Sequence, residues 1–345
     1  MGQRPVLRLE WGERAGQACL RVSRAGTNGP IDAEQLRVYP TDVAASGTAG
    51  LPPMTGRRGT DGNGAWFVPR FGFMPGTSYT VVCEGDAASL DRPAAPGEPT
   101  TTVLAIYPST PALPRNHLRV YVHFSAPMSE GCALAHVHVR DAATREELAG
   151  ALLETTEELW DRERRRLTLL FDPGRIKRGL VPQRQAGYPL VPGRPVELLV
   201  DAGFRDALGL PLAAGSVRTY DVGPDLRGHV DPASWALRPP EVGTRAPLVV
   251  DFDRPLDHGL LVHSLSVTGP DGARVPGVIG AGPEERSWAF APARPWAPGA
   301  YRLDVDHRLE DVAGNSVARV FDRDLSDPCD NPRPEEPARL RFVIA

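Results

Sequence analysis

The sequence has few cysteines, few aromatic residues and almost no lysine. Its 345 residues include four cysteines, Cys19, Cys83, Cys132 and Cys329, none of them in a CxxC pair. So few scattered cysteines exclude a disulfide-rich scaffold. Arginine carries almost all the positive charge, and the net charge is −4. No region is strongly basic, which argues against a general nucleic-acid-binding protein.

Membrane-spanning and targeting segments are also missing from the sequence. It has no run of about 18 apolar residues, so we expect no membrane span. The first residues, Met-Gly-Gln-Arg-Pro-Val-Leu-Arg-Leu, lack the apolar core of a signal peptide. Two localisations remain open: periplasmic, secreted or cell-surface if a leader was removed, and cytoplasmic otherwise.

Motifs of common catalytic sites do not occur. The sequence has no Gly-x-Ser-x-Gly, no phosphate-binding glycine loop and no His-Glu-x-x-His. A noncatalytic binding or scaffold protein is therefore the favoured function class, with no cofactor. An enzyme of unrecognised type is the alternative, because active-site groups can come from several loops.

Short apolar segments that alternate with polar residues run along the whole chain. A length of 345 residues suits two or three domains, and 41% apolar with 24% charged residues is typical of globular proteins. In the first hundred residues the alternation predicts antiparallel strands at 6–11, 19–23, 36–39 and 79–83. The Gly/Thr/Pro-rich stretch from Ala44 to Gly64 predicts a long loop.

One strand segment occurs twice. Most of residues 118–131 returns as residues 247–259, so that Phe124 matches Phe252 and Gly131 matches Gly259 at a constant offset of 128 positions. The chain therefore repeats a β-rich module.

Further motifs extend the repeat to three modules. Phe-x-Pro occurs at residues 67–69, 171–173 and 290–292, and Pro-Gly at 75–76, 192–193 and 298–299. In the last two modules an Asp-x-x-Gly turn follows, at residues 206–209 and 311–314, where Asp supplies an acceptor and Gly tolerates positive φ. We predict an all-β chain of three tandem Ig-like antiparallel β-sandwiches, with domains at residues 1–105, 106–224 and 225–345.

The combined pattern resembles a known group of domains. An apolar strand ending in Phe-Ser-x-Pro-Met, followed by Phe-x-Pro, Pro-Gly-x-x-Tyr and Asp-x-x-Gly-Asn, is similar to the bacterial Ig-like domains that occur in tandem in secreted and cell-surface proteins. The resemblance covers residues 107–223 and 238–324, and it is weaker in the first module. It implies a Greek-key sandwich that serves as a spacer, adhesion or binding module.

The second module departs from the repeat by an insertion. From the Phe of Phe-x-Pro to the Pro of Pro-Gly, the first and third modules span 8 positions and the second spans 21. The extra residues, 174–187, include four cations: Arg175, Lys177, Arg178 and Arg184. Guanidinium groups suit the capture of an anionic ligand, an acidic glycan or a protein partner. The alternative is a structural connector, or a hairpin that docks on the neighbouring module through Ile176 and Leu180.

Trp160 lies upstream of the insertion, in the charged stretch 154–166. An aromatic side chain there either covers the end of the sandwich or forms a stacking platform for a ligand. The flanking acidic and basic halves predict a hairpin with its turn at residues 161–164.

Three histidines of the second module form the candidate transition-metal site. His136 and His138 flank Val137, so strand alternation directs both imidazoles to the outer face, and His123 also faces outward on its strand. Three imidazoles suit Zn or Cu. The site requires that the two strands belong to the same sheet, and the alternative is a set of solvent-facing polar residues.

Two weaker hypotheses concern other residues. Cys19 and Cys83 form an inter-sheet disulfide in one interpretation and remain unpaired in the other, which strand alternation favours. The acidic stretch 322–330 either offers oxygens to Ca²⁺ or is a plain linker, since it lacks EF-hand spacing.

Overall fold

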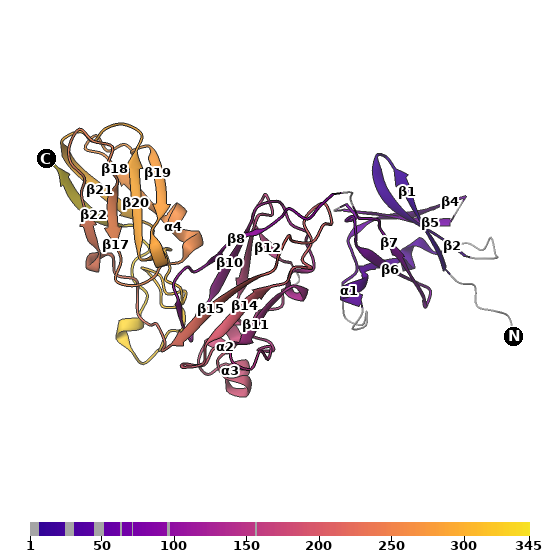
Figure 1. Ribbon diagram of the computed structural model, residues 1–345. Coiled ribbons are helices and arrows are strands. Elements are labelled where there is room, and N and C mark those ends of the chain that lie inside the picture. Colours follow the sequence, from indigo (N-terminus) through magenta and orange to yellow (C-terminus); the bar gives the residue numbers. More distant parts are fainter. Residues whose placement is uncertain are drawn as a thin grey trace. The chain divides into compact units, whose positions relative to one another are not determined.

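The computed structural model describes residues 7–24, 31–44, 52–62, 64–70, 72–94, 97–155 and 157–345. By its internal contacts the chain divides into two compact units (Figure 1). The first comprises residues 1–102, 126–132 and 202–214, and the second comprises residues 103–125, 133–201 and 215–345.

The N-terminal sandwich has two antiparallel sheets. One sheet has the order β1-β2-β5-β4 and the other β3-β6-β7. Their strands are β1 (Leu7–Arg14), β2 (Gln17–Arg24), β3 (Arg37–Pro40), β4 (Gly56–Asp61), β5 (Gly64–Pro69), β6 (Ser78–Cys83) and β7 (Asp86–Asp91). Buried alternate residues such as Leu20, Val22, Phe67 and Val81 fill the core, as period-two patterning predicts.

One expectation for this sandwich was wrong, and the favoured interpretation of its cysteines, that they remain unpaired, is confirmed. Part of the predicted long loop is the edge strand β4, in which Gly56 and Gly59 lie against aromatic rings: an added Cβ would sit 2.6 Å from Phe67 and 2.7 Å from Trp66. Glycine thus marks close packing here. Cys19 and Cys83 are both buried, yet none of the four cysteines forms a disulfide. The Cys83 thiol is directed at the carbonyl of Asp32, at 3.8 Å.

The second sandwich pairs a sheet of order β12-β13-β10-β8 with one of order β11-β14-β15-β9. Its strands are β8 (Val103–Tyr107), β9 (Ala112–Pro114), β10 (Arg119–Phe124), β11 (Val137–Asp141), β12 (Leu159–Trp160), β13 (Arg166–Leu170), β14 (Val196–Val200) and β15 (Ser216–Gly223). All pairs are antiparallel except β9 with β15. The predicted hairpin joins β12 to β13.

The third sandwich repeats this plan with the sheets β16-β17-β20-β19 and β18-β21-β22. Its strands are β16 (Ala236–Arg238), β17 (Leu248–Asp251), β18 (Leu265–Thr268), β19 (Gly277–Ala281), β20 (Ser287–Pro292), β21 (Gly299–Val305) and β22 (Ala338–Ile344). Its core includes Leu248, Val250, Trp288 and Leu303, each 0% exposed. The predicted all-β class and the three tandem sandwiches are confirmed.

Helices are short and join the strands. They are α1 (Thr41–Ala44), α2 (Pro173–Ile176), α3 (Val181–Ala186) and α4 (His258–Ser264), with 3₁₀ turns at Ala33–Gln35, Ala133–Ala135, Pro232–Ser234, Pro283–Glu285 and Pro328–Asp330. In the part of the chain that the structure describes, no helix is long and apolar enough to cross a membrane.

The two Asp-x-x-Gly turns have the predicted chemistry. The Asp206 carboxylate accepts from the amides of Leu208 and Leu210, and the equivalent Asp311 carboxylate accepts from Ala313 and Asn315. Gly209 and Gly314 have φ of 80° and 81°, a conformation that strongly favours glycine.

Candidate functional site at the junction of the second and third sandwiches

The inserted segment of the second sandwich forms the two short helices α2 and α3. Asp172 caps α2 by accepting from the amide of Gly174 at 2.8 Å, and proline occupies the first turn of both helices. Ile176 is 0% exposed, whereas Leu180 is 44% exposed. Only Ile176 therefore anchors the segment in the protein interior.

Arg175 closes the inserted segment on its own sandwich. Its guanidinium donates to five main-chain carbonyls, at distances of 2.8–3.3 Å, from Ala149, Gly150, Ala186, Gly187 and Tyr188. These donors are used inside the protein, so the contacts of Arg175 are structural.

Arg178 joins the inserted segment to the third sandwich's Asp322. Its amide donates to Asp322 Oδ1 at 3.1 Å, and its Nε donates to Asp322 Oδ2 at 2.7 Å. Arg227, in the connection between the sandwiches, donates to the same Oδ2 at 2.8 Å. The Asp322 side chain is only 9% exposed, so two charge-assisted contacts compensate its burial.

A second carboxylate extends this chain of ion pairs. Asp225 accepts from Arg115 Nε at 2.5 Å and Nη2 at 2.9 Å, and from Arg227 Nη2 at 2.9 Å. The hydrogen bonds from Arg115, together with those from Arg227, hold the pKa of Asp225 below its ordinary value against the opposing effect of burial. The result is an alternating series of arginines and aspartates across the junction.

Asp257 forms another polar contact of the junction, from the start of α4. It accepts from Tyr121 Oη at 2.7 and 2.9 Å and from Arg119 Nη1 at 3.4 Å, while it also caps α4 through the amide of Leu260. Burial, then the Asp257 charge, raises the pKa of Tyr121, so its hydroxyl stays protonated and donates. Arg119 also pairs with Glu310.

Main-chain contacts and a glycine complete this interface. The amide of Leu118 donates to the carbonyl of Val312 at 2.9 Å, and the amide of Ser109 donates to the buried carboxylate of Glu285 at 2.7 Å. A Cβ on Gly259 would lie 2.8 Å from the Tyr121 hydroxyl. Gly259 is therefore required for the close approach of Tyr121.

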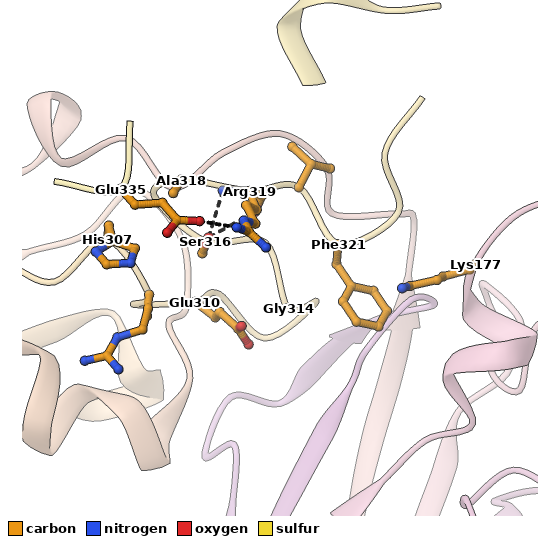
Figure 2. Close-up of a pocket in the computed structure, with 11 residues that line it drawn as sticks. Lys177, His307, Glu310, Gly314, Ser316, Ala318, Arg319, Phe321 and Glu335 are labelled. Atoms are coloured by element: carbon orange, nitrogen blue, oxygen red, sulfur yellow. Dashed lines mark hydrogen bonds and ion pairs between the residues drawn. The ribbon is translucent and has the colours of Figure 1, made fainter. Parts of the chain in front are cut away.

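The remaining predicted ligand-binding residues have different environments. Lys177 places its ammonium 4.4 Å from the centre of the Phe321 ring (Figure 2). Arg184 is exposed on α3. Trp160 packs on the buried Phe124, with ring centres 5.9 Å apart, and donates to Glu158 at 2.7 Å. These contacts give Trp160 a covering position at the edge of the sandwich.

A cavity of about 500 Å³ lies beside Lys177 at this junction (Figure 2). Cationic Arg308 and Arg319 line it together with Glu310 and Glu335. Each of these carboxylates already has an arginine partner, Arg119 and Arg319 respectively.

The structure does not bring the three candidate metal ligands together. His123 lies on β10, whereas His136 and His138 flank Val137 in the other sheet. His138 Nδ1 contacts Glu147 at 3.0 Å, and His123 packs edge-on against Tyr107 at 5.2 Å. Burial, then the charge of His258, lowers the pKa of His123. Within the described residues no cluster of three or more His, Cys, Asp or Glu could hold a metal ion.

Sequence reasoning missed most of the junction residues. Asp257 and Gly259 lie in the repeated segment, and Asp322 lies in the acidic stretch, so all three were visible as motifs. Their partners Tyr121, Arg178 and Arg227 are far away in the sequence. The sequence thus gave signals for single residues of this surface, and none for which residues pair across it.

Comparisons with known proteins do not assign the chain to a family. No protein-family model matches the chain, and no curated protein matches it. Similar solved structures include Escherichia coli alpha-2-macroglobulin domains MG0-NIE-MG1, with a TM-score of 0.24 and 8% identity over 71% of this chain and 90% of that one. Chicken CNTN1 FN1–FN3 has a TM-score of 0.20 and 11% identity over 99% and 98%. The titin I9–I11 tandem has 0.18 and 7% over 85% and 89%.

Proposed function

We propose that the protein is a noncatalytic scaffold of tandem Ig-like sandwiches that works outside the cytoplasm, and that its second and third sandwiches form one rigid body. The observation that carries the rigid body is that Asp322 accepts hydrogen bonds from both Arg178 and Arg227. If the two sandwiches moved freely about a flexible linker, the Asp322 carboxylate and the two guanidinium groups would be solvated instead of paired. The second contact, through Asp257, restrains rotation about the first.

Under this proposal the insertion connects the second sandwich to the third. The first and third sandwiches make the same connection in 8 positions, so the extra length is not needed to form a sandwich. It places Lys177 and Arg178 on the third sandwich. Small interfaces between domains usually permit relative motion, and a chain of partly buried ion pairs opposes that motion.

Pulsed electron paramagnetic resonance on the full chain tests the rigid body. Spin labels are attached at Val217→Cys on β15 and Val343→Cys on β22, both exposed positions, after Cys132→Ser and Cys329→Ser remove the accessible thiols. We expect one narrow distance distribution, which Asp322→Ala broadens and Asp251→Ala, at a partly exposed carboxylate whose ion pair with Arg238 lies within the third sandwich, leaves narrow. A broad distribution before any junction change contradicts the proposal.

Recognition of an anionic ligand by the inserted segment is the second candidate. The cavity beside Lys177 and the exposed Arg184 favour it, because neither side chain has a carboxylate partner among the described residues. Calorimetric titration with inorganic phosphate and with heparin tests this candidate. Binding that Lys177→Gln or Arg184→Gln weakens supports it, and binding unaffected by both changes excludes the segment.

A further inference from the structure

The edge strand β19 of the third sandwich has an unusual composition for its position. It is the last strand of the sheet β16-β17-β20-β19, and its five residues are Gly-Val-Ile-Gly-Ala. It carries no charge, and Val278 is 75% exposed. A flat, apolar, exposed edge is a template for pairing with another strand.

The equivalent edges of the other sandwiches are protected. β4 carries Arg57, Arg58 and Asp61, and β12 has only two residues. Charge and shortness are the usual protections of an edge strand. Within the third sandwich, β22 carries Arg339 and Arg341. β19 has neither protection, so its exposure is a specific feature of this edge.

The hydrogen bonds between β19 and β20 show which backbone amides and carbonyls of β19 face away from the sheet. Gly282 N donates to Ser287 O and Ala293 N donates to Pro276 O, both at 2.8 Å. Because bonded and nonbonded pairs alternate along an antiparallel ladder, Val278 and Gly280 bond to β20. The amides and carbonyls of Gly277, Ile279 and Ala281 therefore face away from it, without a partner from another segment among the described residues.

An apolar cavity adjoins these outward groups. It measures about 320 Å³ and lies between β18 and β19, where Val267, Val275, Ile279 and Phe290 line it. Arg274 lines the same cavity, is exposed, and makes no ion pair among the described residues. Helix α4 also lies next to β19 (Figure 1). The cavity is thus lined by apolar side chains and by the cation Arg274, and it lies beside the edge of β19, which offers backbone donors and acceptors.

We propose that the β19 edge binds an extended peptide segment of a partner protein by strand addition. The peptide backbone pairs with Gly277 and Ile279, one apolar side chain enters the cavity, and a neighbouring carboxylate contacts Arg274. Strand addition gives affinity through main-chain hydrogen bonds and specificity through pockets for alternate side chains. This activity goes beyond the scaffold role and does not depend on the Asp322 junction.

A second copy of the chain fits this edge less well. In a symmetric antiparallel pair the facing residues are Gly277, Ile279 and Ala281 of the copy. The Ile279 side chain packs against its own core, so no side chain is left to enter the neighbouring cavity. A foreign strand supplies alternate side chains without that restriction.

The test selects nine-residue peptides from a phage-displayed library with the full-length protein. We expect enriched sequences with apolar residues at alternate positions and an acidic residue beside one of them. Binding of the best peptide, followed by fluorescence anisotropy, should fall at least about tenfold when its inward amides are N-methylated, because each loses a hydrogen bond. If the N-methylated peptide binds as tightly as the unmodified one, strand addition is overturned.

Protein variants locate the site. Val275→Phe, which fills the cavity, should weaken binding at least about tenfold, and Arg274→Glu should change the preference from an acidic to a basic peptide residue. Val343→Lys on β22 is the matched control for Val278→Lys on β19, and only the latter should weaken binding. Melting temperatures confirm that each variant folds. Equal binding by all variants, or a concentration-dependent dimer that Val278→Lys abolishes and no peptide displaces, overturns the proposal.

Discussion

The second and third sandwiches share a repeat but differ where they connect strands. From Phe171 to Pro192 the second sandwich uses 21 positions, and from Phe290 to Pro298 the third uses 8. The longer connection buries Ile176 and reaches Asp322, and the shorter one stays within its own sandwich. The difference shows that the repeated residues specify the sandwich, and that departures from the repeat specify how the two sandwiches are joined.

Removing the insertion makes the two sandwiches alike in this connection. Replacing residues 174–187 with one glycine restores a spacing of 8 positions. We expect the melting temperature to fall by about 8 °C or more, roughly 2–3 kcal/mol, because buried Ile176 and the ion pairs at Asp322 are lost. Thermal unfolding by circular dichroism measures the change. Unchanged stability with lost binding of an anionic ligand would instead assign the segment to recognition.

The turn carboxylate of the third sandwich, Asp311, provides a pH test. Asp311 is 0% exposed, and burial raises its pKa to about 6, although hydrogen bonds from Asn315 and Ala313 oppose the rise. A carboxyl whose folded pKa exceeds its unfolded value of about 3.9 loses stability as pH rises from about 4 to 6. The loss is on the order of 3 kcal/mol at most.

Denaturant unfolding at pH 4 and pH 6 should therefore show a pH slope that Asp311→Asn reduces. Asp306 is the matched control, since hydrogen bonds from Arg308 lower its pKa to about 2 against opposing burial. Its contribution is present above about pH 4 and is lost as pH falls toward 2, so Asp306→Asn should leave the slope between pH 4 and 6 unchanged. The same slope in the wild type and Asp311→Asn contradicts this assignment.

The matched glycines Gly131 and Gly259 are required for different reasons. Gly131 has φ of 88° and no atom within 4 Å of its Cβ position. At Gly259, in contrast, an added Cβ would lie 2.8 Å from the Tyr121 hydroxyl. Gly259→Ala should cost about 1–3 kcal/mol through overpacking. Urea unfolding measures it, and Gly280→Ala, which meets no atom within 4 Å, is the control. Equal stability of the two variants would show that Tyr121 can move away from the added methyl group without a loss of folding free energy.

The sequence predicted the strands better than the contacts between sandwiches. Alternating residues such as Val196, Leu198 and Val200 face one core, so period-two patterning was sufficient for β14. The edge strand β4 was missed because its glycines signal a loop when their aromatic neighbours are unknown.

The candidate site shows the same limit more strongly. Arg178 and Asp322 are 144 positions apart, and each is an ordinary charged residue of its own segment. Only folding establishes that they meet. The insertion was nevertheless detectable, because three copies of one module show which residues the fold does not require.

Removing the charge of Lys177 should give the smallest change in melting temperature, and it tests a single contact between the inserted segment and the third sandwich. It is the only lysine in the sequence, so amine reagents modify one side chain besides the chain's α-amine. Acetylation removes the charge that faces Phe321, whereas reductive methylation retains it. A cation over an aromatic ring contributes about 0.5–1 kcal/mol at a partly exposed site, so acetylation should lower the melting temperature by about 1–4 °C. Methylation should change it less, and Lys177→Gln should reproduce the acetylated protein. Equal melting temperatures for the acetylated and methylated proteins would show that the charge of Lys177 contributes nothing to the junction.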